Sequence, residues 1–219
     1  MALAQVVRRR WDGDHTVDPW GLDTDLVELV APLAALRWSV DGHGGSGQLS
    51  TGPAVVVFNR QLGWSEPFVV VRALHQATGR FLRVVGAPDR APVGPALRRL
   101  GAVLHRPDEL AGLLRAGEVA ALPLGRSLRN RHHAGRIDLE ALAPALATGA
   151  PVVPAAVVGR EVGRRWRVRF GAPIHPPVGR SPMAAAELAD AVRLGVQGLI
   201  DATVRGSPGR SPGRTYTRQ

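Results

Sequence analysis

Short apolar runs alternate with helix-like segments along most of this sequence. Continuous runs such as VVVF at 55–58 and PVVPAAVVG at 151–159 are typical of strands buried on both faces. RRWRVRF at 164–170 instead alternates polar and apolar residues, which predicts a strand with one polar face. Together these patterns predict strands at 55–58, 81–85, 102–104, 118–123, 151–159 and 164–170.

The segments between these strands have the apolar spacing of helices. Gly79 and Gly117 are placed to end two of them. The expected helices cover 67–78, 95–100, 108–117, 138–149 and about 182–205. Strands spaced by helices imply crossover connections, and therefore an α/β fold with a mostly parallel or mixed central sheet flanked by helices. Ligands of such sheets lie beyond the carboxyl ends of the strands, so the loops after residues 58 and 122 form the candidate site.

The N-terminal part carries a further helical pattern. Residues 22–38 form an amphipathic segment in which Asp25 and Glu28 resemble a capping box, and Pro32 is expected to kink or break the helix. The glycine cluster at 41–48 is interpreted as a flexible connection. We expect a basic N-terminal arm at 1–21, a single domain at 22–205 and a disordered basic tail at 206–219.

Charge and composition narrow the possible chemistry. All 28 basic residues are arginines, against 18 acidic residues, and the net charge is +10. More than half of this excess comes from six arginines in the two terminal arms, namely Arg8, Arg9, Arg10, Arg210, Arg214 and Arg218. The absence of cysteine excludes disulfides, thiolate nucleophiles and zinc–cysteine sites, and the absence of lysine excludes Schiff-base chemistry. Bidentate recognition of phosphate or carboxylate by arginine remains open.

No apolar run approaches the ~20 residues that span a bilayer. We therefore expect a cytoplasmic protein, with its arms and residues 22–38 able to hold it on the anionic inner face of a membrane. Specific nucleic-acid binding is not expected, because aromatic residues make up only 5% of the chain and no reading motif is present. A non-specific electrostatic contribution from the arms remains possible.

Four ordered segments carry a family resemblance. They are VVVFNRQLGWSEP, GAVLHR at 101–106, LPLGRS at 122–127 and the strand containing Val153, Pro154 and Ala155. This set resembles the lysophosphatidate acyltransferase family of glycerophospholipid acyltransferases over about residues 50–175. Asn59 and Pro67 match the first family block, and Gly101 and Arg106 match the second. The resemblance implies transfer of an acyl group from acyl-CoA or acyl carrier protein to a lysophospholipid-like acceptor, without metal or further cofactor.

The sequence departs from the family at the positions that do the chemistry. In the family, a histidine takes the proton of the acceptor hydroxyl and an aspartate orients it. Arg60 stands at the histidine position and cannot act as a base. Ser65 stands at the strict aspartate spacing, or Glu66 if one residue is inserted. The third block has Leu124 in place of its glutamate and lacks its threonine.

Other residues are candidates for the missing roles. His133 and Asp138 have the family spacing and are a possible substitute for the base, although two solvated loop histidines, His132 and His133, are the simpler interpretation. Arg106, Gly125 and Arg126, with Arg60, are candidate binders of a substrate phosphate, against the alternative of ordinary surface arginines.

Three functions remain open at this point. The first is a divergent acyltransferase, and the second is a catalytically inactive protein of the same fold that binds or regulates through a phospholipid, lysophospholipid or acyl thioester. The third is non-specific nucleic-acid binding. Loss of a general base typically costs about 10²–10⁴ in rate, so the histidine mechanism is expected to be very slow here.

Overall fold

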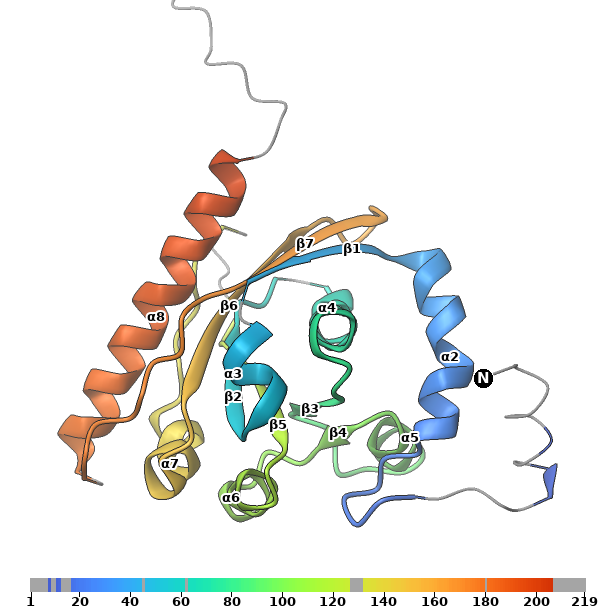
Figure 1. Ribbon diagram of the computed structural model, residues 1–219, viewed down its shortest axis with the longest axis horizontal. Coiled ribbons are helices and arrows are strands. Elements are labelled where there is room, and N and C mark those ends of the chain that lie inside the picture. The colour runs from blue at the N-terminus through green and yellow to red at the C-terminus, as the bar shows by residue number, and fades with distance from the viewer. Residues whose placement is uncertain are drawn as a thin grey trace, which may run out of the picture.

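A mixed seven-stranded sheet forms the centre of the computed structural model (Figure 1). The structure describes residues 8, 11–12, 17–44, 46–61, 63–126, 132–179 and 181–206. The strand order is β1-β7-β6-β2-β5-β3-β4, and all neighbours are parallel except the antiparallel pair β6 and β7. The strands are β1 (Ser39–His43), β2 (Ala54–Phe58), β3 (Leu82–Val85), β4 (Ala102–Val103), β5 (Val119–Pro123), β6 (Val152–Gly159) and β7 (Arg165–Phe170). The predicted α/β fold with a mixed sheet is confirmed.

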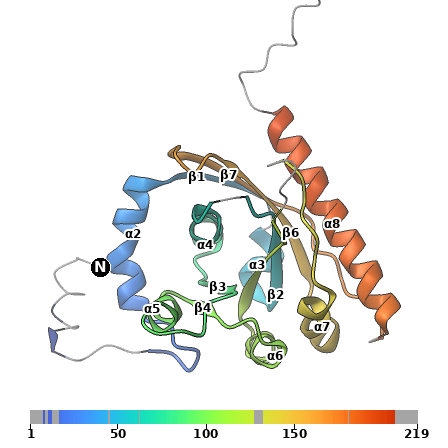
Figure 2. The same cartoon turned by 180° about the vertical axis from the view of Figure 1, so that it is seen from behind.

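Helices cover both faces of this sheet (Figures 1 and 2). One core joins the sheet to α3 and α4, and the other joins it to α6, α7 and α8. At the opposite edge of the molecule from α8 stands α2, beside α5. The described helices are α2 (Thr24–Arg37), α3 (Ser46–Thr51), α4 (Ser65–Thr78), α5 (Val93–Arg99), α6 (Pro107–Arg115), α7 (Leu139–Thr148) and α8 (Pro182–Arg205). Among them, none is both long and apolar enough to cross a bilayer.

Strand β2 shows why the apolar runs become central strands. All five of its residues are buried, and the strand pairs with β5 on one side and β6 on the other. Because successive side chains alternate between the faces, Val55 and Val57 enter the core under α6–α8, while Val56 and Phe58 enter the core under α4. A strand covered on both faces has no need of polar positions, which explains its unbroken apolar sequence.

The N-terminal region departs from the sequence prediction. Helix α2 runs through Pro32 without the predicted break, and its N-cap is Asp23, whose side chain accepts from the Leu26 amide, rather than Asp25. The glycine cluster at 41–48 contains the end of β1 and the start of α3, which the flexible-connection interpretation missed. β1 lies at the edge of the sheet and pairs only with β7, so it has little apolar pattern to reveal it.

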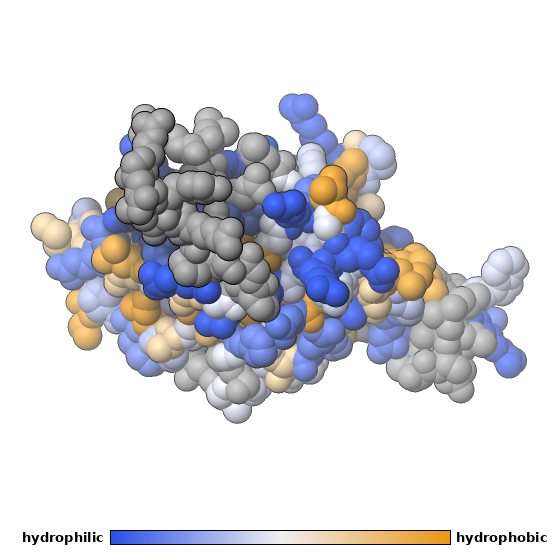
Figure 3. All heavy atoms as spheres, turned by 90° about the horizontal axis from the view of Figure 1, so that it is seen from above, coloured by the Kyte–Doolittle hydropathy of each residue, from blue (hydrophilic) through white to orange (hydrophobic). Residues whose placement is uncertain are grey.

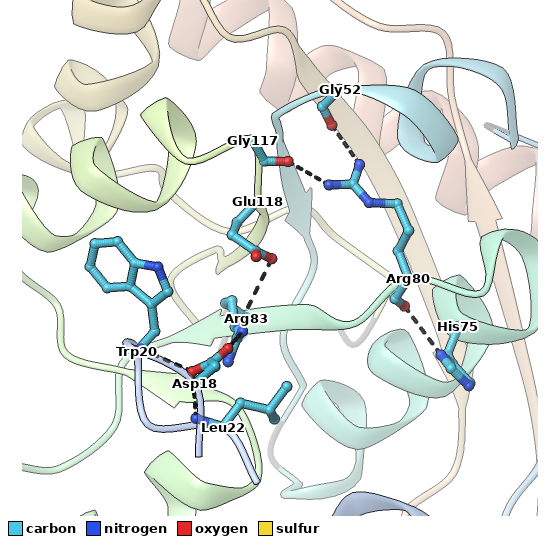
Figure 4. A network of polar contacts seen from close by, with 9 residues as sticks. All are labelled: Asp18, Trp20, Leu22, Gly52, His75, Arg80, Arg83, Gly117 and Glu118. Carbon is cyan, nitrogen blue, oxygen red and sulfur yellow. Dashed lines mark hydrogen bonds and ion pairs between the residues drawn. The ribbon is translucent and has the colours of Figure 1, made fainter. Parts of the chain in front are cut away.

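A buried arginine fastens the segment before α2 to the sheet (Figure 4). Arg83 on β3 is 2% exposed, donates a hydrogen bond to the Asp18 carboxylate and lies 3.9 Å from the Glu118 carboxylate. The other oxygen of Asp18 accepts the amides of Trp20 and Leu22, each at 2.9 Å. Packing of the chain therefore begins before residue 22, while the division into arm, domain and tail stays a prediction.

A second arginine closes the amino-terminal edge of the sheet. Arg80, just before β3, donates to the carbonyl oxygens of Leu49 at 3.1 Å, Gly52 at 2.6 Å and Gly117 (Figure 4). One guanidinium thus holds the end of α3, the turn before β2 and the turn before β5. These bonds hold the segments at the amino-terminal ends of the strands together, on the side of the sheet opposite the carboxyl ends where ligands of parallel sheets bind.

The Arg83 network predicts an asymmetric response to substitution. Asp18→Asn keeps the backbone hydrogen bonds but leaves the buried Arg83 with too little negative charge, so we expect it to lower the free energy of unfolding by about 2 kcal/mol. Arg83→Met removes the buried charge itself and should cost less. Urea denaturation of both single variants and the double variant measures this. A larger loss in Arg83→Met than in Asp18→Asn would contradict the assignment.

Candidate functional site

The candidate site begins where β2 leaves the sheet. Asn59 is buried and its amide group exchanges two hydrogen bonds with Val157 of β6, donating to the carbonyl at 2.9 Å and accepting the backbone amide at 2.7 Å. This double contact fixes the direction of the chain immediately before Arg60. The family-like Asn59 therefore has a structural role here, which is to orient the loop between β2 and α4.

Arg60 and Arg126 come close together at the carboxyl ends of β2 and β5, because these two strands are paired. Burial and the neighbouring Arg126 guanidinium lower the pKa of Arg60 below its ordinary value, and Glu66 opposes this effect. Arg60 is half-buried, whereas Arg126 and Gly125 are exposed. The lowered pKa means that loss of water contact, and to a smaller degree the like charge of Arg126, destabilise the charged guanidinium of Arg60.

Glu66 supplies the one carboxylate that acts on Arg60. It is fully buried in the first turn of α4, where the helix dipole favours a negative charge. Its Oε1 accepts the backbone amide of Gln61 at 3.1 Å, while Oε2 has no hydrogen-bond partner, and neither has Nε of Arg60. Of the two aspartate alternatives drawn from the sequence, Glu66 is therefore the one directed toward the loop that carries Arg60.

Ser65, the other alternative, is engaged elsewhere. Its hydroxyl donates to Oε1 of Glu161 at 2.7 Å, and its backbone amide donates to Oε2 of the same carboxylate at 3.2 Å. The Trp38 indole donates to the Ser65 hydroxyl at 3.1 Å. Glu161, in the turn between β6 and β7, thereby caps the start of α4, and Gly63 lacks the Cβ that would collide with it.

The third family-like block continues from β5. Leu124 is buried in the core under α6–α8, where a glutamate side chain would be charged without a partner. Its amide donates to the Phe58 carbonyl at 2.8 Å, which extends the pairing of β5 with β2 by one step. The Gly125 amide donates to the Arg136 carbonyl at 2.8 Å and so positions Arg126. Ser127 of this block lies outside the described residues.

Arg106 lies at the same edge of the sheet but has a partner of its own. It is the N-cap of α6, and its guanidinium donates to the Asp89 carboxylate at 3.0 Å on the protein surface. Arg106 and His105 border a small hollow at the carboxyl ends of β3 and β5, and Leu110, Leu122 and Pro144 line its apolar side. Arg106 is not among the charges that shift the pKa of Arg60.

The possible substitute base is not assembled. Asp138 is the N-cap of α7, and its carboxylate accepts the Glu140 amide at 3.1 Å. His133 is exposed, and no hydrogen bond or ion pair joins these two described residues. The carboxylate that would orient the imidazole is instead used to begin a helix. The described residues also contain no group of three or more histidines and carboxylates arranged to hold a metal ion.

Sequence reasoning did not find Glu161, although it shapes the start of α4. Glu161 is 96 positions from Ser65, and only the antiparallel turn between β6 and β7 brings it there. No spacing in the sequence signals such a contact. The arginines at 9, 10, 210, 214 and 218 of the two predicted basic arms lie outside the described residues.

Comparisons with known proteins agree with this architecture. No protein-family model matches the chain. Uncharacterized proteins of Mycobacterium leprae and Mycobacterium tuberculosis are 27% identical to it over 259 aligned positions, which cover 90% of this chain and 70% and 72% of the two relatives. These relatives therefore share most of their length with it and carry no stated activity.

A solved structure gives the fold. The crystal structure of the 1-acyl-sn-glycerophosphate acyltransferase PlsC from Thermotoga maritima superposes with a TM-score of 0.60 and covers 93% of this chain and 89% of that one. The two sequences are 15% identical, so the similarity is one of fold. The chain has the fold of the acyltransferase PlsC, with an arginine where the resemblance to the acyltransferase family places the catalytic histidine.

Proposed function

We propose that this protein binds the phosphate group of a lysophospholipid or of an acyl thioester between Arg60 and Arg126, and that it does not transfer acyl groups by the histidine mechanism. The observation that carries this proposal is the placement of Arg60 and Arg126 just beyond the carboxyl ends of the paired strands β2 and β5, where burial and then the Arg126 charge lower the pKa of Arg60. Two guanidinium groups that repel each other are stabilised by an anion placed between them, and arginine matches phosphate oxygens bidentately. The PlsC-like fold supports a lipid or acyl ligand in general.

The alternative is acyl transfer from acyl-CoA or acyl carrier protein to a lysophospholipid-like acceptor. It requires a group that takes a proton from the acceptor hydroxyl, and Arg60 holds its own proton too firmly for that role. No carboxylate of the described residues is bonded to His133, and Leu124 stands where the third block of the family has a polar side chain. Binding without turnover therefore agrees better with the described side chains.

The proposal predicts which arginines matter. Arg126→Gln should weaken binding of a fluorescent monoacylglycerol phosphate by about tenfold or more, because a charge-assisted contact to the phosphate is lost. Arg115→Gln is the matched control, since Arg115 is exposed at the end of α6, which leads to the amino-terminal end of β5. Arg106→Gln should have a smaller effect, because Asp89 already holds that guanidinium.

The measurement is fluorescence anisotropy, with the corresponding monoacylglycerol as the ligand without phosphate. The proposed phosphate site would be contradicted by equal affinity of the wild-type protein for the two ligands. It would also be contradicted by equal losses of affinity in Arg126→Gln and Arg115→Gln.

A second prediction distinguishes a protein that only binds its ligand from an acyltransferase of greatly reduced activity. The double variant Arg60→His, Glu66→Asp restores both family side chains, yet we expect no release of free thiol from acyl-CoA above the wild-type rate in the presence of lysophosphatidate. The reason is that the buried Leu124 still occupies the place of the third-block glutamate. A gain of about 10²-fold, the usual contribution of a general base, would instead support a degraded enzyme with an intact acceptor pocket.

A further inference from the structure

Four strongly exposed apolar side chains lie at one corner of the molecule, beside the start of α4. They are Leu33 and Leu36 near the end of α2, Trp64 just before α4, and Val162 at the turn between β6 and β7, with exposed fractions of 65%, 69%, 75% and 93%. We refer to these four residues as the apolar corner. Single exposed apolar residues are ordinary, but several gathered together mark a surface that meets a partner.

Hydrogen bonds join the three segments that carry these residues. The Arg37 guanidinium at the end of α2 donates to the Gly163 carbonyl at 3.0 Å and also to the Glu161 carbonyl. Glu161 in turn accepts the Ser65 amide and hydroxyl. The end of α2, the β6–β7 turn and the start of α4 therefore form one connected surface.

Aromatic contacts beneath this surface hold it in place. The Trp38 ring stacks on Phe68 with their centroids 5.5 Å apart, and the Arg37 guanidinium lies 5.7 Å from the Trp38 ring centre. The Trp38 indole also donates to Ser65. These contacts tie the end of α2 to the start of α4, so a partner that binds the corner does not have to bring these two segments together.

Positive charge surrounds the corner. Arg160, Arg164 and Arg165 are exposed, and none of them forms an ion pair with another described residue. The nearby Glu161 carboxylate is already bonded to Ser65. Figure 3, seen from above the view of Figure 1, shows hydrophobic residues lying among strongly hydrophilic ones on this side of the molecule. Apolar side chains among unpaired arginines match a surface that is anionic outside and apolar beneath.

We propose that the apolar corner inserts into the interfacial layer of an anionic membrane. Side chains exposed to this degree project outward, which suits a deformable lipid layer better than the rigid, pre-shaped hollow that a protein partner would have to offer. Tryptophan favours the interfacial layer, and each arginine near anionic headgroups adds attraction. Trp64 is four residues from Arg60, so docking at this corner brings the proposed phosphate site to the lipid surface.

This surface differs from the one expected from the sequence. The sequence suggested an amphipathic helix at 22–38 together with the basic arms. In the structure, the described side chains of α2 do not form one apolar and one polar face, since only Asp25 is buried and apolar residues lie all around the helix. The exposed apolar side chains of the corner therefore come from the β6–β7 turn and Trp64 as well as from α2.

The test is flotation of the full-length protein with vesicles of phosphatidylcholine, with and without phosphatidylserine. We expect binding only to the anionic vesicles, and a loss of about tenfold or more in the triple variant Leu36→Ser, Trp64→Ser, Val162→Ser. The matched control is Val178→Ser, Met183→Ser, Leu194→Ser, whose residues are as exposed but lie in and before α8, and it should bind as the wild type does. Arg160→Gln and Arg164→Gln should each weaken binding by about fivefold.

A second readout reports insertion directly. Quenching of tryptophan fluorescence by brominated lipids should fall markedly in Trp64→Phe, although this variant still binds the vesicles. Unchanged quenching would overturn the proposal, as would equal losses in the two triple variants. Replacement of Arg210, Arg214 and Arg218 by glutamine must leave most of the binding, because otherwise the tail and not the corner is responsible. The triple variant of the corner should still bind the fluorescent monoacylglycerol phosphate in solution, so that failure of the phosphate site and failure of the corner give different results.

Discussion

The pairing of β2 with β5 and β6 is the constraint on which the candidate site depends. Because β2 is buried on both faces and ends next to β5, the residues after the two strands emerge at the same edge of the sheet. Arg60 and Arg126 are brought together by this pairing. The hydrogen bonds of Asn59 with β6 and of the Leu124 amide with β2 then fix the directions in which the chain leaves the two strands. The meeting of two like charges is thus a consequence of sheet topology, tolerated because Glu66 offsets part of the repulsion.

The same fold arranges very different side chains from those that the acyltransferase family uses for chemistry. At the position where the family resemblance places a base stands Arg60, a cation that keeps its proton, and at the position of the third-block glutamate stands Leu124, which joins the core. These two side chains depart from the family pattern, although the fold that carries them is that of PlsC. What remains is a scaffold with positive charge at the position where ligands of parallel sheets bind.

Most of the fold could be predicted from the sequence because buried strands and capped helices leave local signals. The apolar run of β2 and the positive φ of Gly79 at the end of α4 are examples. β1 and the contact of Glu161 with Ser65 could not be predicted. An edge strand of five residues has little apolar pattern, and a contact across 96 positions depends on how β7 turns back beside β6. For the site, the family-like spacing singled out Arg60 but left Ser65 and Glu66 as alternatives, and it gave no sign of the ion pair of Arg106 with Asp89.

The cap that Glu161 provides couples two positions that lie far apart in the sequence. An aspartate at position 65 would place a second carboxylate within hydrogen-bonding distance of Glu161, where only a donor is tolerated. Introducing the strict family spacing at position 65 therefore needs a compensating change at position 161. The two positions have to be substituted together, because neither substitution alone preserves the hydrogen bonds that begin α4.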